Sequence, residues 1–197
     1  MIDGYKHHVF VSYARSGDIP GWLHTHFVPV LTNRLEAILD EDPDIFVDQK
    51  IEVGTDWPDV LDEALNQSCC MIAVWSPKYF RSKWCLAEWE TMLAREEKLG
   101  LKSNGSPGLV YPVVYSGGKS FPEIARRTQQ RVDLSGYAYP YPQFRNTDKF
   151  LAFHDKVSEI ADDLQQWLDN VPPWSPDWER IKKPEMSEPD PPRFRRL

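Results

Sequence analysis

A tryptophan and a glutamate lie four residues apart in the segment RSKWCLAEWE, residues 81–90. If a helix begins here with Ser82 as its N-cap, Trp84 and Glu88 share one helical face, one turn apart. Because an apolar run precedes the segment closely, Trp84 is also placed near the carboxyl end of a strand. The pair could belong to a reaction site. The alternative is a tryptophan that covers a loop beside an ordinary surface glutamate.

The rest of this helix, predicted to run to about Lys98, is amphipathic. Its apolar residues form one arc, which we expect to face a sheet: Cys85, Leu86, Trp89, Met92 and Leu93. A second group falls on the opposite side: Trp84, Glu88, Thr91 and Arg95. Packing against a sheet therefore accounts for Trp89 but not for Trp84.

Strands and helices are predicted to alternate along the whole chain. Apolar and β-branched runs indicate strands at residues 7–14, 45–49, 69–76 and 109–116. Periodicity and start signals indicate helices within residues 18–44 and at 57–68, 82–98, 122–130 and 147–170. This alternation implies a parallel sheet with helices on both faces.

In such sheets ligands bind outside the carboxyl ends of the strands, so the residues that follow each strand are site candidates. Ser12, Tyr13 and Arg15 follow the first strand, and Asp48 follows the second. Arg15 could meet a phosphate, or it could be a solvated loop charge. Asp48 could contact substrate, or it could brace its loop with hydrogen bonds.

Other reactive residue types lack the partners or spacing that chemistry needs. The five histidines have no serine or cysteine partner at a recognisable spacing, and the three cysteines suit neither a disulfide framework nor a metal site. Cys85 falls on the packing arc, and we interpret it as a core residue. YSGGKS at 115–120 lacks the full spacing of a phosphate-binding P-loop.

The composition limits the setting of the protein. The chain has 197 residues and a formal net charge of −7, which argues against broad binding to nucleic acids or anionic membranes. We expect no signal peptide, no membrane span and a reducing, cytoplasmic location. Seven of the 17 prolines fall in the last 27 residues. We therefore predict a domain at 1–170 and an extension at 171–197, which either packs through Trp174 and Trp178 or begins a linker.

Several motifs, taken in order, resemble those of Toll/interleukin-1 receptor (TIR) domains of the bacterial and plant type. HVFVSYA resembles the first conserved box of that family, although His8 stands where an aspartate is frequent. FVDQKIEVGTDWPDVLDEALNQS resembles the second, and MIAVWSPKYFRSKWCLAEWE carries Ser-Pro-x-Tyr and Ser-x-Trp-Cys-x-x-Glu. LVYPVVY is similar to a later strand of the family. The resemblance covers about residues 5–170 and implies a flavodoxin-like, three-layer fold with a five-stranded parallel sheet.

The resemblance also implies an activity. Many plant and bacterial members cleave NAD+ at the nicotinamide–ribose bond, and the motif glutamate that this reaction needs corresponds to Glu88. NAD+ is then the substrate, and neither a cofactor nor a metal is expected. Trp84 could stack on the substrate or exclude water. Lys50, Ile51, Glu52, Val53 and Gly54 resemble the family's loop for gating and self-association.

Three classes of function remain open from the sequence. The first is an NAD+ glycohydrolase or cyclase that assembles with other TIR domains, as homo-oligomers or filaments, and is similar to members that act in anti-phage defence. Its product is ADP-ribose or a cyclic or modified ADP-ribose, which an effector protein could sense. The second is a non-catalytic module for TIR–TIR interaction. A bacterial effector that mimics host adaptors is a third class, for which the sequence shows no delivery signal.

Overall fold

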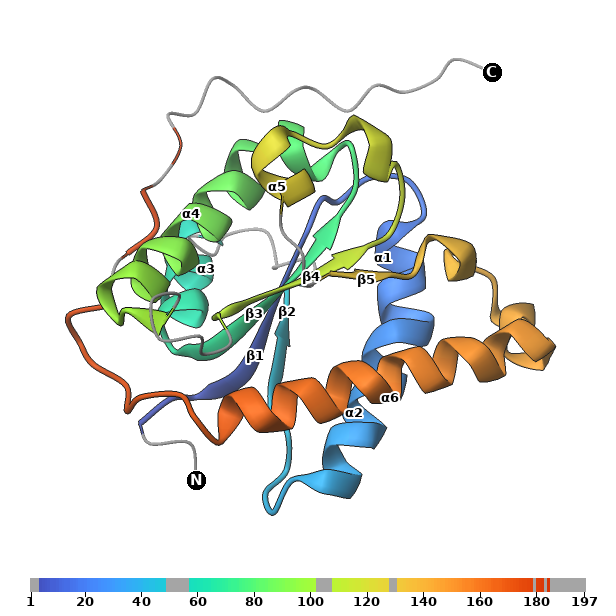
Figure 1. Cartoon of the computed structure of the whole chain (residues 1–197), viewed down its shortest axis with the longest axis horizontal. Helices are drawn as coiled ribbons and strands as arrows, with labels where there is room; N and C mark the ends of the chain where they lie inside the picture. The colour runs from blue at the N-terminus through green and yellow to red at the C-terminus, as the bar shows by residue number, and fades with distance from the viewer. Residues whose placement is uncertain are drawn as a thin grey trace.

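The architecture is known from a computed structural model, which describes residues 4–48, 57–101, 108–127, 131–178, 180–182 and 184. A five-stranded, fully parallel sheet in the order β2-β1-β3-β4-β5 forms the middle layer (Figure 1). The strands are β1 (His7–Tyr13), β2 (Ile45–Val47), β3 (Ser68–Trp75), β4 (Val110–Val114) and β5 (Val132–Asp133). This strand order is that of flavodoxin-like folds, as expected from the sequence.

Helices cover both faces of the sheet (Figure 1). One layer contains α1 (Ile19–Trp22), a π-helical turn (Leu23–Phe27), α2 (Val28–Ile38) and α6 (Asp148–Leu168). The other layer contains α3 (Trp57–Asn66), α4 (Lys83–Lys98) and α5 (Glu123–Arg127). Short 3-10 turns lie in the connections of the described residues, at Tyr79–Arg81, Gly118–Ser120, Ser135–Tyr137 and Pro142–Asn146.

Strand alternation divides the core into two clusters. Successive side chains of a strand point to opposite faces. Val9, Val11 and Tyr13 of β1 therefore pack under α1, α2 and α6, whereas Phe10 and Ala14 pack under α3 and α4. Ser12 points to the same face as Phe10 and Ala14 by this alternation. That orientation aims its hydroxyl at α4.

The first helix expected from the sequence is one continuous rod with a π-helical turn in its middle. Pro29 stands two residues after the π-helical turn, where the regular pattern of hydrogen bonds to the residue four positions earlier is already interrupted. The short strand β5, next to β4, was not recognised in the sequence pattern. It has only two residues, and a run of that length has no readable period.

The chain after α6 runs back over the layer that contains α3 and α4. Trp178 is buried against α4, with its ring centre 5.6 Å from the Arg95 guanidinium carbon. The indole N–H of Trp174 donates to the Asn66 side chain at 3.3 Å, and the buried Ile181 joins the core cluster under α3. In the described residues, the segment after α6 is thus part of the packed molecule as far as Lys182.

Candidate active site

Glu88 lies in the second turn of α4, at the carboxyl end of the sheet. The helix begins after Ser82, whose side chain accepts a hydrogen bond from the Cys85 amide at 3.3 Å, as an N-cap does. This start places Glu88 against the end of β1, which lies between β2 and β3 in the sheet. The side chain of Glu88 is only 5% exposed.

The Ser12 hydroxyl group meets the Glu88 carboxyl group, and the Tyr79 hydroxyl group meets Ser12. Ser12 Oγ lies 2.5 Å from Glu88 Oε2 and 3.0 Å from the hydroxyl oxygen of Tyr79. Ser12 is 1% exposed and Tyr79 is fully buried. Within the described residues, no hydrogen bond reaches the other carboxyl oxygen, Oε1. Glu88 therefore has one carboxyl oxygen anchored by Ser12 and, in the part of the chain that the structure describes, one without a hydrogen bond.

Burial makes Glu88 a weak acid. It raises the pKa of the carboxyl group to about 8, because a buried charge loses its hydration. The hydrogen bond from Ser12 lowers this pKa, Asp48 raises it, and Arg15 lowers it. The carboxyl group is therefore mostly protonated at pH 7, and a nearby cation would favour its ionisation.

The predicted packing arc of α4 was incomplete, although Cys85, Trp89 and Met92 are buried as expected. Glu88, Thr91 and Arg95 were expected opposite the packing arc, yet all three are buried, together with Glu96. The Arg95 guanidinium donates to the carbonyls of Ser68 at 2.8 Å and of Leu65 and Asn66 at 3.3 Å. Glu96 Oε1 accepts from the amides of Leu109 and Val110 at 2.7 and 3.0 Å. The helix buries polar side chains because backbone groups satisfy them, so hydrophobicity alone misplaces its inner face.

Trp84 is half-buried at the edge of the cluster between the sheet and α4. Packing thus accounts for part of this ring, which the sequence did not explain by the core. Trp84 lies one turn before Glu88 on the same helix, as predicted. Its contact with a substrate stays a prediction.

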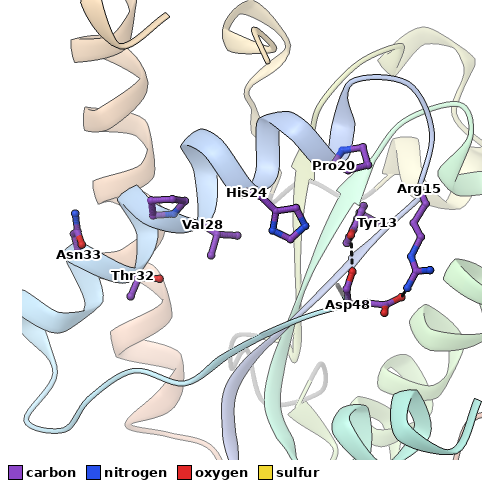
Figure 2. Close-up of a pocket in the computed structure, with 9 residues that line it drawn as sticks. Tyr13, Arg15, Pro20, His24, Val28, Thr32, Asn33 and Asp48 are labelled. Atoms are coloured by element: carbon purple, nitrogen blue, oxygen red, sulfur yellow. Dashed lines mark hydrogen bonds and ion pairs between the residues drawn. The ribbon is translucent and has the colours of Figure 1, made fainter. Parts of the chain in front are cut away.

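A groove of about 840 Å³ opens on the other side of the end of β1 (Figure 2). Tyr13, Arg15 and Asp48 form one end of it, His24 stands midway, and Thr32 and Asn33 of α2 lie at the far end; the remaining lining residues are Pro20, Val28 and Pro29. The Tyr13 hydroxyl donates to the Asp48 carbonyl at 2.7 Å, and the Arg15 guanidinium forms an ion pair with the Asp48 carboxylate.

The structure thus brings five of the sequence-predicted residues together around the end of β1. Ser12 meets Glu88 on the α4 side, and Tyr13 lines the groove on the α2 side. Arg15 and Asp48 lie close enough to Glu88 for their charges to influence its pKa. The predicted gating loop, from Lys50 to Gly54, lies outside the described residues.

A TIR-domain family model matches residues 9–147. The chain belongs to the TIR domain family. No curated protein sequence matches this TIR domain significantly.

Two solved structures resemble this TIR domain. The TIR domain of the Toll-related receptor TRR-2 from Hydra magnipapillata is 18% identical, with 77% of this chain and 98% of that chain covered and a TM-score of 0.45. The TIR domains of the activated Roq1 resistosome, which directly recognises the pathogen effector XopQ, are 20% identical, with 82% and 94% covered and a TM-score of 0.38.

Tyr79 and His24 are the site residues of this TIR domain that the sequence analysis did not select. Tyr79 belongs to the quoted Ser-Pro-x-Tyr motif, so the signal was present, but nothing in the spacing connects it to Ser12, 67 positions earlier. His24 was set aside with the other histidines. It lines the groove because the π-helical turn Leu23–Phe27 holds it there.

The remaining reactive residues of the TIR domain are placed as core residues. All three cysteines are free and buried, and burial raises the pKa of the Cys85 thiol to about 12.

The described residues contain no group of three or more histidine, cysteine and acidic side chains that could hold a metal ion. None of the helices in the described ranges combines the length and the apolar character that a membrane crossing requires.

Proposed function

We propose that this TIR domain cleaves NAD+ at the nicotinamide–ribose bond, with Glu88 as the catalytic residue. The observation that carries the proposal is the state of the Glu88 carboxyl group. It is buried at the carboxyl edge of a parallel sheet, one oxygen is held by Ser12, and a groove opens beside it. Ligands of such sheets bind at this edge.

The chemistry requires one carboxylate. Breaking the bond leaves an oxocarbenium-like ribose, which a carboxylate stabilises through charge and through hydrogen bonds to the ribose hydroxyls. Nicotinamide leaves as a neutral molecule from a cationic ring, so no general acid is needed. The same cationic ring favours the ionised form of Glu88 when the substrate binds, which offsets the raised pKa of the free protein.

The arrangement around β1 suggests how an extended dinucleotide is held. The ribosyl-nicotinamide half reaches Glu88 and is covered by Trp84. The pyrophosphate passes Arg15, which lies at one end of the groove, and the adenosine half enters the groove past Tyr13 and Asp48. Arg15 is half-exposed, and its guanidinium has five N–H donors, so it can serve a phosphate beside Asp48.

The proposed product and biological role are those of an NAD+ glycohydrolase or cyclase that assembles with other TIR domains. Water exclusion around Trp84 decides between ADP-ribose and a cyclic or modified ADP-ribose. Assembly with other TIR domains activates the enzyme, and the product signals to an effector protein in bacterial anti-phage immunity. The three free, buried thiols suit a reducing cytoplasm.

A second candidate function is a non-catalytic TIR–TIR interaction module. The observation that favours it is the exposure of large apolar side chains. Leu151 of α6 is 68% exposed, Tyr141 is 67% exposed and Ile124 is 59% exposed. Side chains of this kind are suited to a protein interface.

The test is to incubate concentrated protein with NAD+ and to identify the products by chromatography with mass detection. Glu88→Gln keeps the shape of the side chain but cannot ionise. Glu90→Gln changes an exposed residue of the same helix and is the matched control. We expect nicotinamide release by the wild type and the control, and none by Glu88→Gln. Self-association without turnover at high concentration would assign the chain to the interaction class instead.

A further inference from the structure

The hydroxyl groups of Tyr79 and Ser12 form a chain that ends on Glu88. Ser12 Oγ carries one proton and has two oxygen neighbours, Glu88 Oε2 at 2.5 Å and the Tyr79 hydroxyl at 3.0 Å. When Glu88 is ionised it is an acceptor only, so Ser12 donates to Glu88. Tyr79 then donates to Ser12. Each donor in this chain strengthens the next.

This pattern differs from that of the buried Ser68 and Thr91 hydroxyl groups. The Ser68 hydroxyl donates to the carbonyl of Ala64 at 2.6 Å, and the Thr91 hydroxyl donates to the carbonyl of Ala87 at 2.7 Å. Such bonds to the backbone four residues earlier are the usual way to satisfy a buried hydroxyl. Ser12 and Tyr79 come from β1 and from the 3-10 turn before α4, and they converge on a carboxyl group instead.

The other groups around Glu88 give its ionised form little net stabilisation, so the hydroxyl chain is what stabilises it. Burial keeps the pKa of the Tyr79 phenol well above its usual value and raises that of the Cys85 thiol to about 12, so both stay neutral. From the ends of β1 and β2, Arg15 and Asp48 act on Glu88 with opposite signs, and they form an ion pair with each other.

We propose that Ser12 and Tyr79 are positioning residues that hold Glu88 Oε2 and thereby aim Oε1 at the ribose. The role of Ser12 in this chain is direct, and Tyr79 acts through Ser12 by orienting and polarising its hydroxyl. This inference rests on the proposed cleavage of NAD+ and deepens it. It also assigns a role to the tyrosine of the Ser-Pro-x-Tyr motif, which the chemistry of the bond does not itself require.

The first measurement is the titration of the Glu88 carboxyl carbon by NMR in protein labelled at glutamate, with the signal assigned by its loss in Glu88→Gln. Ser12→Ala removes the bond to the charged form, so we expect the pKa of Glu88 to rise by about one unit. Tyr79→Phe gives a smaller rise. Ser68→Ala and Tyr111→Phe are matched controls, because each removes a buried hydroxyl elsewhere, and they leave the titration unchanged.

The second measurement is turnover of NAD+ against pH in the same variants. We expect Ser12→Ala to lower kcat about tenfold at pH 7 with little change in KM. The pH at which turnover rises should shift upward by the same amount as the pKa of Glu88 measured by NMR. Ser12→Thr, which keeps a hydroxyl, restores most of the activity. Titrations of Ser12→Ala and Tyr79→Phe that coincide with the wild type would overturn the inference.

The two measurements separate this inference from the proposed function. If the wild type releases no nicotinamide, NAD+ cleavage fails, and with it the role of the pair in that reaction. The NMR titration does not depend on turnover. A shift in Ser12→Ala and Tyr79→Phe then still supports the hydroxyl chain as the device that sets the state of Glu88.

Discussion

Arg15 and Asp48 pair with each other across the carboxyl ends of β1 and β2 at one end of the open groove, and the charges of both act on the pKa of the buried Glu88. The carbonyl of the same Asp48 accepts the hydroxyl proton of Tyr13 at 2.7 Å. Three side chains that the sequence could only place after two strands are thus joined into one wall. A substrate that reaches both Glu88 and the groove must pass this wall.

Replacing Arg15 tests whether the wall holds a pyrophosphate. A hydrogen bond to a charged group contributes about 1.5–3 kcal/mol, so we expect Arg15→Gln to raise KM for NAD+ by about tenfold or more. Nicotinamide riboside lacks the pyrophosphate, and its KM should not change. The assays are run at pH 9, where Glu88 is ionised in both the wild type and Arg15→Gln. Lys156→Gln removes a surface cation of α6 from its pair with Glu159 and serves as the control.

An equal loss with both substrates would contradict this assignment. Arg15 would then act on the nicotinamide half or on the wall itself. The ion pair with Asp48 makes the second outcome measurable, because a collapsed wall would also move the ring signals of Tyr13 in an NMR spectrum recorded without substrate, assigned by their loss in Tyr13→Phe.

Glu88 should make the stability of the protein depend on pH. Its pKa in the folded protein is about 8, against an ordinary value of 4.5 for an exposed glutamate. Between these values the folded state binds more protons than the unfolded state, so the free energy of unfolding falls as pH rises through this window. With about 1.4 kcal/mol for each pKa unit, the fall due to Glu88 is on the order of 5 kcal/mol.

Chemical denaturation at pH 5 and pH 8.5 measures this dependence. We expect Glu88→Gln to lose this part of the pH dependence and to gain stability relative to the wild type at pH 8.5. Glu90→Gln keeps the wild-type dependence, because Glu90 is exposed. Parallel pH dependences in wild type and Glu88→Gln would show that Glu88 titrates near its usual value.

The sequence was a good guide to the elements and a poor guide to the inner face of α4. Four of the five strands and the long helices follow from apolar runs and periodicity, and the residues after β1 and β2 do gather at one edge. Glu88 was found through its motif, but its burial was not. Hydrophobic periodicity assumes that charged residues face water, whereas Arg95 and Glu96 are buried among backbone carbonyls and amides.

Long-range pairing explains what the sequence could not supply. Ser12 and Tyr79 meet because β1 and β3 are neighbours in the sheet, with Ser12 opposite Ala73, and because the turn after β3 folds back over β1. The arrangement depends on strand order and on side-chain direction at once. A single sequence contains the residues of such a cluster but not the distances between them.

The rate of cleavage should rise with pH. Only the ionised form of Glu88 stabilises an oxocarbenium-like ribose, so kcat/KM for NAD+ is expected to rise through an apparent pKa near 8. The rise of kcat with pH occurs at lower pH than the rise of kcat/KM, because the cationic nicotinamide ring favours the carboxylate in the complex with NAD+. Nicotinamide release between pH 5.5 and pH 9.5 measures both limbs. A rate that falls across this range would identify a required acid and exclude a carboxylate mechanism.

The segment after α6 should contribute to stability through Trp178. Its ring is 8% exposed and lies over the Arg95 guanidinium at 5.6 Å and the Lys98 ammonium at 5.9 Å. Loss of a buried aromatic ring and of these cation–π contacts predicts that Trp178→Ala costs about 3 kcal/mol in urea denaturation. Tyr141→Ala, at a 67% exposed ring, is the control and stays within about 0.5 kcal/mol.

A chain that ends at residue 170 extends this test to the predicted domain boundary. It lacks both Trp178 and Ile181, which joins the core cluster under α3. We therefore expect it to unfold at a lower urea concentration than Trp178→Ala does. The same midpoint as the full chain would show that the domain ends with α6 and that the packed segment after it adds nothing to stability. A lower midpoint would place residues 171–182 inside the folded unit, because their removal exposes apolar surface of α3 and α4 to water.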